Sequence, residues 1–122
     1  MTKEKVKYVI KRLPYILEMI RKGISEKDFY ISKNKEKIII DEEVFSVIRI
    51  VDEIIENEQA SWLKRIFIGI KNGKSDVAII LNSPAERTKY YEIKREFINK
   101  IYTCCVSKGL VSYEEVLKSK IG

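Results

Sequence analysis

Basic and hydroxyl-bearing side chains gather on one predicted helix in the second half of the chain and on the segment before it. Side chains of these types bind the phosphates and base edges of DNA. Duplex DNA carries a phosphate charge about every 1.7 Å and its major groove admits a helix, so the binding residues should lie on a helix. The candidate DNA-binding residues are Lys71, Lys74, Arg87, Thr88, Lys89, Tyr91, Lys94 and Arg95.

The position of each candidate along the helix predicts its role. The residues near the beginning of the helix are expected to meet base edges, and they are Arg87, Thr88 and Lys89. The remaining cations are expected to meet phosphates, and they are Lys71, Lys74, Lys94 and Arg95. Tyr91 is expected to stack on a sugar or to donate a hydrogen bond to a phosphate. The alternatives are an ordinary solvated helix and a segment that binds protein.

Catalytic and metal-binding chemistry has little support in the sequence. The chain contains no histidine, and its two cysteines, Cys104 and Cys105, are adjacent, so we interpret both as reduced helix residues. Four carboxylates lie on one predicted acidic helix without a convergent partner, and they are Asp52, Glu53, Glu56 and Glu58. We therefore expect no enzyme, no cofactor, no metal site and no small-molecule substrate.

A short helix followed by a turn is predicted just before the basic helix. The short helix begins at a cap provided by Ser75 or Asp76, and residues 82–84 then force a turn. Its buried residues are expected to be Val77, Ile80 and Leu81.

The longer basic helix has a sequence signature at its start. Ser83 is expected to be the N-cap, with Pro84 in the first helical position and Glu86 completing a capping box. The buried residues of this helix are predicted to be Tyr90, Ile93, Phe97 and Ile101. A short helix, a turn and a longer basic helix together form a helix-turn-helix signature.

The run RTKYYEIKREFINKI, preceded by KNGKSDVAIIL and WLKRIF, resembles phage late-gene transcriptional regulators of the RinA and ArpU type. The resemblance covers about the last half of the chain, and this half of those regulators looks like the fourth domain of bacterial sigma factors. The matching positions are Gly73, the segment 75–81, Ser83, Tyr90, Tyr91, Lys94 and Arg95. The resemblance implies a sigma-like helix-turn-helix that binds duplex DNA.

Two features depart from the family pattern and leave the register of the recognition helix open. Asn82 stands where a glycine is common, and residues 83–86 lengthen the turn. If Ile93 is the buried anchor, Arg87 and Lys89 face the DNA groove. If Tyr91 is the buried anchor, the outward set of side chains rotates by about half a turn.

The first 60 residues are expected to form a protein-facing part. Apolar residues at helical spacing predict a helix that ends near Gly23, with Pro14 either kinking it or separating two helices. Two β-rich runs favour a small β-hairpin near residues 29–41, and Asp41 is expected to cap an acidic helix. The apolar stripe of that helix is predicted to be Val44, Val47, Ile48, Val51, Ile54 and Ile55. Its acidic side is either a solvated surface or a contact with RNA polymerase or a second copy of the chain.

The remaining predicted elements complete a mainly α fold. A helix is expected around Trp62–Ile70, ending before Asn72-Gly73, and Lys108-Gly109 should end the basic helix. A capping box at residues 112–115 opens a short C-terminal helix. We predict a single domain over residues 1–122, a helical bundle with an N-terminal part (1–60), a helix-turn-helix part (61–109) and a short tail (110–122).

Charge alternates along the chain by segment. Residues 1–40 carry 11 basic and 5 acidic side chains, residues 41–60 carry 1 and 7, and residues 61–109 carry 10 and 4. This pattern favours a polyanion-binding face beside a separate face that DNA would repel. The apolar runs are too short for a bilayer and the first residues lack a signal-peptide core, so we expect a cytoplasmic protein without a membrane partner.

Together these patterns predict a sequence-specific, duplex DNA-binding transcriptional regulator of a phage or mobile genetic element. The expected partners are double-stranded DNA and, on another face, RNA polymerase or a second copy of the chain. One alternative is a phage small terminase subunit, which would use a similar helix-turn-helix but assemble into rings. The other is a protein-interaction module that acts on RNA polymerase or a repressor without contacting DNA.

Overall fold

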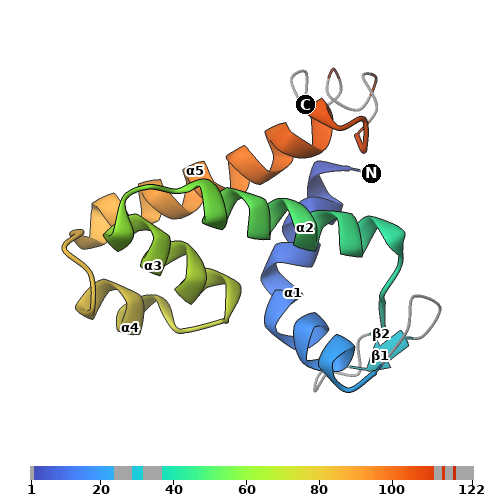
Figure 1. The fold of residues 1–122 in the computed structure, drawn as a ribbon, viewed down its shortest axis with the longest axis horizontal. Coiled ribbons are helices and arrows are strands. Elements are labelled where there is room, and N and C mark those ends of the chain that lie inside the picture. Colours follow the sequence, from blue (N-terminus) through green and yellow to red (C-terminus); the bar gives the residue numbers. More distant parts are fainter. Residues whose placement is uncertain (1, 24–28, 32–36, 112–113, 115–116, 118–122) are drawn as a thin grey trace.

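Helices form most of the described chain, which confirms the predicted mainly α fold. The computed structural model describes residues 2–23, 29–31, 37–111, 114 and 117. The elements along the chain are α1 (Lys3–Arg21), β1 (Phe29–Ile31), β2 (Lys37–Ile39), α2 (Glu42–Asn57), α3 (Ser61–Lys71), α4 (Asp76–Leu81) and α5 (Arg87–Ser107). Helix α2 packs on α5, α1 and α3 each contact both of these helices, and α4 packs on α3 (Figure 1). No helix in the described part of the chain is long and apolar enough to cross a membrane.

Helix α1 runs without interruption through Pro14, so the predicted alternative of two separate helices does not occur. The hydroxyl of Thr2 accepts a hydrogen bond from the backbone N–H of Lys5 at 3.1 Å and caps the first turn. Gly23 follows the last turn with φ of 90°, a conformation that glycine adopts without strain, and this confirms the predicted end. The proline ring packs on Gly73, where an added Cβ would lie 2.5 Å from Pro14 Cγ.

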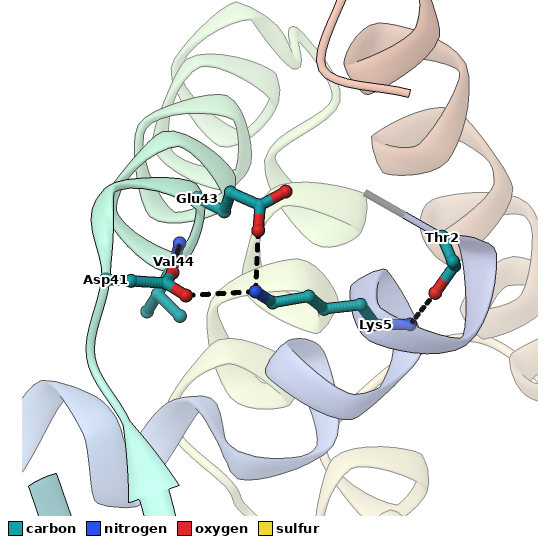
Figure 2. Close-up of polar contacts among 5 residues, drawn as sticks. All are labelled: Thr2, Lys5, Asp41, Glu43 and Val44. Carbon is teal, nitrogen blue, oxygen red and sulfur yellow. Dashed lines mark hydrogen bonds and ion pairs between the residues drawn. The ribbon is translucent and has the colours of Figure 1, made fainter. Parts of the chain in front are cut away.

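Helix α2 begins at the predicted Asp41 cap. One carboxylate oxygen of Asp41 accepts a hydrogen bond from Val44 N at 3.0 Å, while the other pairs with Lys5 Nζ of α1 at 3.0 Å (Figure 2). The same ammonium contacts Glu43 Oε1 at 2.7 Å. Partial burial opposes the charge on Lys5, but the hydrogen bonds to Glu43 and Asp41 outweigh it and raise the pKa of Lys5. The start of α2 is thereby tied to α1.

The two short strands pair antiparallel within the region where a hairpin is predicted. Phe29 lies opposite Ile39, Tyr30 opposite Ile38, and Ile31 opposite Lys37. The residues that join them, 32–36, lie outside the described part of the chain. Ile40, directly after β2, is fully buried and connects this region to the core.

The core lies where α1, α2, α3 and α5 meet. The predicted stripe of α2 is buried except for Ile48, which is half-buried, and Ile50 joins it. All four residues predicted to be buried on α5 are buried. The rings of Phe67 from α3 and Phe97 from α5 stack with centroids 4.2 Å apart. This stack fixes the longest helix, α5, against α3.

The predicted buried face of α4 is wrong. Val77 is 62% exposed and Leu81 is 78% exposed, and the residue buried on this helix is Ile79. The helix is so short that one contact decides its orientation: a Cβ on Gly69 of α3 would lie 3.0 Å from Ile79 Cγ1. Because α3 offers a glycine there, Ile79 fills the space, while Val77 and Leu81 turn toward solvent. Ile80, the third residue predicted to be buried, is partly buried against the core.

Helix α5 ends as predicted, with Lys108 as its C-cap and Gly109 at φ of 76°. Val111, two residues after Gly109, is buried in the core. The predicted capping box at residues 112–115 lies almost entirely outside the described residues.

Candidate nucleic-acid interface

Helix α4 is anchored at both ends by short-range hydrogen bonds. Ser75 is its N-cap, and Ser75 Oγ accepts a hydrogen bond from Ala78 N at 3.2 Å. Of the two predicted caps, Ser75 and Asp76, the first is therefore confirmed. At the other end the Asn82 side-chain amide donates to Ala78 O at 2.8 Å. The hydroxyl of Ser83 donates to Ile80 O at 3.3 Å, so this serine belongs to the end of α4.

The predicted capping box at the start of α5 is wrong. The helix begins at Arg87, and Glu86 is its N-cap without a side-chain hydrogen bond. Besides binding Ile80 O, Ser83 Oγ accepts from Ala85 N within the turn, at 3.3 Å. A hydroxyl used there cannot cap the next helix, so residues 82–86 form the turn. Arg87, Thr88 and Lys89 consequently lie in the first turn of α5, next to its positive end.

The register of α5 is the one in which Ile93 is the buried anchor. Ile93 is 5% exposed, whereas Tyr91 is 37% exposed. At about 100° per residue, Thr88, Tyr91 and Arg95 lie on the face opposite Ile93 and Phe97. We call these three residues together with Arg87 the outward face. All four side chains of the outward face are exposed.

A three-residue contact locks α4 onto α5. Asp76 Oδ1 accepts a hydrogen bond from the Tyr90 hydroxyl at 2.5 Å and another from Lys94 Nζ at 3.0 Å. The hydrogen bond from Tyr90 is the largest cause of the lowered pKa of Asp76, and the Lys94 ammonium adds to it. Burial and the same carboxylate raise the pKa of Tyr90, so its hydroxyl stays a proton donor. We call this contact the Asp76 clamp.

The other candidate cations have different surroundings. Lys71 pairs with Asp52 of α2 and so holds α3 against the acidic helix. Lys89 lies 3.7 Å from Glu92 on its own helix and lines a shallow groove beside Trp62. Lys94 belongs to the Asp76 clamp. Within the described residues, these three lysines are therefore partly neutralised before any ligand binds.

The three remaining basic candidates have no acidic partner among the described residues. Among the described residues, neither Lys74 nor Arg87 nor Arg95 forms an ion pair. Thr88 and Tyr91 are exposed between the two arginines. The structure thus brings together Arg87, Thr88, Tyr91 and Arg95 and places Lys74 apart from them, after the turn at Gly73.

The acidic helix α2 supplies counterions to lysines elsewhere in the fold. Lys5 binds Asp41 and Glu43 at its beginning, Lys71 binds Asp52, and Lys108 binds Glu53 at 2.9 Å. These pairs come from α1, from α3 and from the end of α5. These four carboxylates are thus paired away from the outward face, whereas Glu92 and Glu96 of α5 are exposed beside it.

Two basic residues outside the predicted set lie close to two of the candidates. Lys7 and Lys11 of α1 share a groove with Lys74 and Lys94. Their spacing of one helical turn is a signal that they share a face of α1. Nothing local in the sequence indicates that this face adjoins α5.

The described residues contain no group of three or more metal-ligating side chains arranged to hold a metal ion. Cys105 is buried, and burial raises the pKa of its thiol to about 11, which keeps the sulfur protonated and unreactive near neutral pH. No protein-family model matches the chain, and neither a curated protein nor a solved structure is a match for it. Fold and site together define a mainly helical protein with an exposed, basic helix face.

Proposed function

We propose that this protein binds duplex DNA by placing the first half of α5 in the major groove, and that it acts as a sequence-specific transcriptional regulator. The observation that carries the proposal is the outward face itself. Arg87, Thr88, Tyr91 and Arg95 are exposed, and in the described chain neither arginine has an acidic partner. A helix that presents two unpaired arginines around a threonine and a tyrosine matches the chemistry of phosphates and base edges.

The position along α5 assigns roles within the outward face. Arg87 and Thr88 occupy the first turn, the part of a groove-bound helix that reaches base edges. Arg95 lies two turns later, where the helix leaves the groove and meets the phosphates. Tyr91 lies between them and can donate its hydroxyl to a phosphate.

Charge pairing elsewhere in the fold supports the same reading. Lysines of α1, α3 and the end of α5 pair with four carboxylates at the start of α2 and along it, so these acidic charges are compensated away from the outward face. Three exposed glutamates, Glu86, Glu92 and Glu96, remain beside the outward face. The resemblance to RinA and ArpU type regulators supports a role in transcription of a phage or mobile genetic element. The residues that carry this resemblance lie in α5 and in the segments that precede it.

The proposal is tested by selecting duplexes from a random pool with the wild-type protein and then measuring binding of variants to the selected and to a scrambled duplex. Arg87→Ala should weaken binding to the selected duplex by about 1–3 kcal/mol and change binding to the scrambled duplex little. Arg95→Ala should weaken both alike and lower the slope of log affinity against log salt by about one. All measurements share one salt series, since affinities at different salt concentrations are not comparable.

Arg49→Ala is the matched control, because Arg49 is an exposed arginine on α2 that is bonded to Ser46 and lies outside the outward face. It should bind both duplexes as the wild type does. Absence of salt-dependent binding of the wild type to any duplex would refute the proposal. Equal losses for Arg87→Ala and Arg49→Ala would show that α5 does not enter the groove.

A second candidate, a protein-interaction module, has one observation in its favour. Val77 and Leu81 lie one turn apart on α4 and are 62% and 78% exposed. Exposed apolar side chains on a short helix suit a protein contact. If this candidate is correct, the wild type binds no duplex, and replacing both residues by serine abolishes binding to RNA polymerase or a repressor.

A further inference from the structure

A groove of about 510 Å³ lies between α1, the turn from α3 to α4, and the middle of α5. Four lysines line it: Lys7, Lys11, Lys74 and Lys94. They come from three elements that are far apart in the sequence, so only the folded chain brings them together. The packing of Pro14 on Gly73 closes one side of the groove and keeps α1 beside the turn.

The charges around this groove are almost entirely positive. Asp76 is the only acidic residue among the described residues that line it, and its Oδ1 already accepts from Tyr90 and Lys94. Within the described chain, Lys7, Lys11 and Lys74 form no ion pair. Three uncompensated cations around one groove repel one another, and a bound polyanion would relieve that repulsion.

The groove also has an apolar floor, formed in part by Ile10, Ile70 and Ile98. An apolar floor with a lysine rim suits a ligand that alternates charged and weakly polar units. The sugar–phosphate backbone of DNA is such a ligand, because its phosphates can meet the ammonium groups while its deoxyriboses rest on aliphatic carbon.

The groove is continuous with the outward face of α5. Lys94 and Ile98 form its edge on α5, and Lys94 directly precedes Arg95 and lies one turn after Tyr91. A duplex that holds the start of α5 in its major groove leaves one of its strands beside this edge. We infer that the groove holds the sugar–phosphate backbone of the same duplex, with Lys7, Lys11 and Lys74 contacting phosphates.

This inference rests on the proposed DNA binding and extends it to α1. The N-terminal part, expected from the sequence to face protein, contributes DNA contacts of its own. These contacts are to phosphates, so they increase affinity for every sequence alike.

The test compares Lys7→Gln/Lys11→Gln with wild type, using fluorescence anisotropy of a fluorescein-labelled duplex of mixed sequence over a salt series. Each lost phosphate contact lowers the slope of log affinity against log salt by about 0.9, so the double variant should lose about two. Both lysines are exposed, and circular dichroism should show an unchanged fold. Lys7→Arg/Lys11→Arg keeps both charges and should restore the slope.

Arg21→Gln is the control, because it removes an exposed cation from the end of the same helix, outside the groove, that forms no ion pair among the described residues. Its slope should stay close to that of the wild type. A slope for Lys7→Gln/Lys11→Gln equal to that of this control overturns the inference while leaving the proposed function intact. If the wild type itself binds no duplex, both the inference and the proposed function fail. Lys74→Gln, alone, provides an independent check with an expected loss of about one.

Discussion

At the scale of single residues, Asp76 determines how α4 and α5 are joined. One of its oxygens receives both the Tyr90 hydroxyl and the Lys94 ammonium, from consecutive turns of α5. A hydrogen bond to a charged group contributes more than one between neutral groups. The side chain is about one-third exposed, however, so solvent screening reduces the contribution.

We expect Asp76→Asn to lower the free energy of unfolding by about 1 kcal/mol near neutral pH. The pKa of Asp76 is lower in the folded protein than its ordinary value of 3.8. The stability that ionisation provides is therefore present above pH 3.8 and is lost as pH falls through the folded pKa. Denaturant titrations of wild type and variant should converge in strong acid.

Tyr90→Phe is the companion variant, because it removes the donor and keeps the buried ring. The decreases in the free energy of unfolding caused by Tyr90→Phe and by Asp76→Asn should be less than additive, since both variants remove the same contact. A destabilisation by Asp76→Asn that is equal at neutral and strongly acidic pH would show that the carboxylate charge is not its source.

At the scale of elements, the start of α5 decides which residues its first turn exposes. Its first turn opens at Arg87, three residues after Pro84, and Ser83 is bonded to the preceding helix. Helix α5 therefore begins with a cation, Arg87, at its positive end, and no side chain caps it.

Glu86→Ala should change the free energy of unfolding by less than about 0.5 kcal/mol, because this side chain does not cap α5. Ser75→Ala, in contrast, removes the cap of α4 and should cost about 1 kcal/mol. Thermal unfolding of the two variants under one set of conditions gives the comparison. A loss for Glu86→Ala as large as that for Ser75→Ala would show that the Glu86 side chain does cap α5.

The sequence predicted elements with long amphipathic patterns and failed where a short segment depends on its neighbours. The stripes of α2 and α5 repeat over several turns, so their buried faces could be predicted. In α4 four of six positions are large and apolar, and Gly69 of α3 selects Ile79 among them. Ser83 fits a capping box locally, but the competing carbonyl of Ile80 takes its hydroxyl.

In the candidate site, too, features within one helix could be predicted and features that depend on tertiary contacts could not. The outward face could be predicted as a set, because its residues lie on one helix. Lys71, Lys89 and Lys94 could not be recognised as paired, since two of their partners lie on other elements. Lys7 and Lys11 were missed because only tertiary packing places α1 beside α5.

At the scale of the whole molecule, the contact between Pro14 and Gly73 joins α1 to the turn between α3 and α4. Gly73 has φ of 74°, in the left-handed region, and its Cα faces the proline ring. A side chain there would meet two separate penalties, one from the backbone and one from the clash.

Gly73→Ala should therefore lower the free energy of unfolding by about 2–3 kcal/mol. Gly23→Ala and Gly109→Ala are matched controls, because both glycines have positive φ and an added Cβ would meet nothing within 4 Å. Each of these should cost only about 1 kcal/mol. Equal losses for all three variants in chemical denaturation would show that Pro14 does not press on Gly73.

Helix α5 carries the outward face in its first half and buries Phe97, Ile101 and Cys105 farther along. A rigid helix rotates about its axis as one unit, so the orientation of its buried half and that of the outward face cannot be adjusted independently. A substitution that turns α5 to repack its buried half would also turn Arg87 and Arg95. Over evolutionary time the residues of the outward face can be exchanged without disturbing the core, whereas a change in core volume that rotates α5 also reorients the outward face.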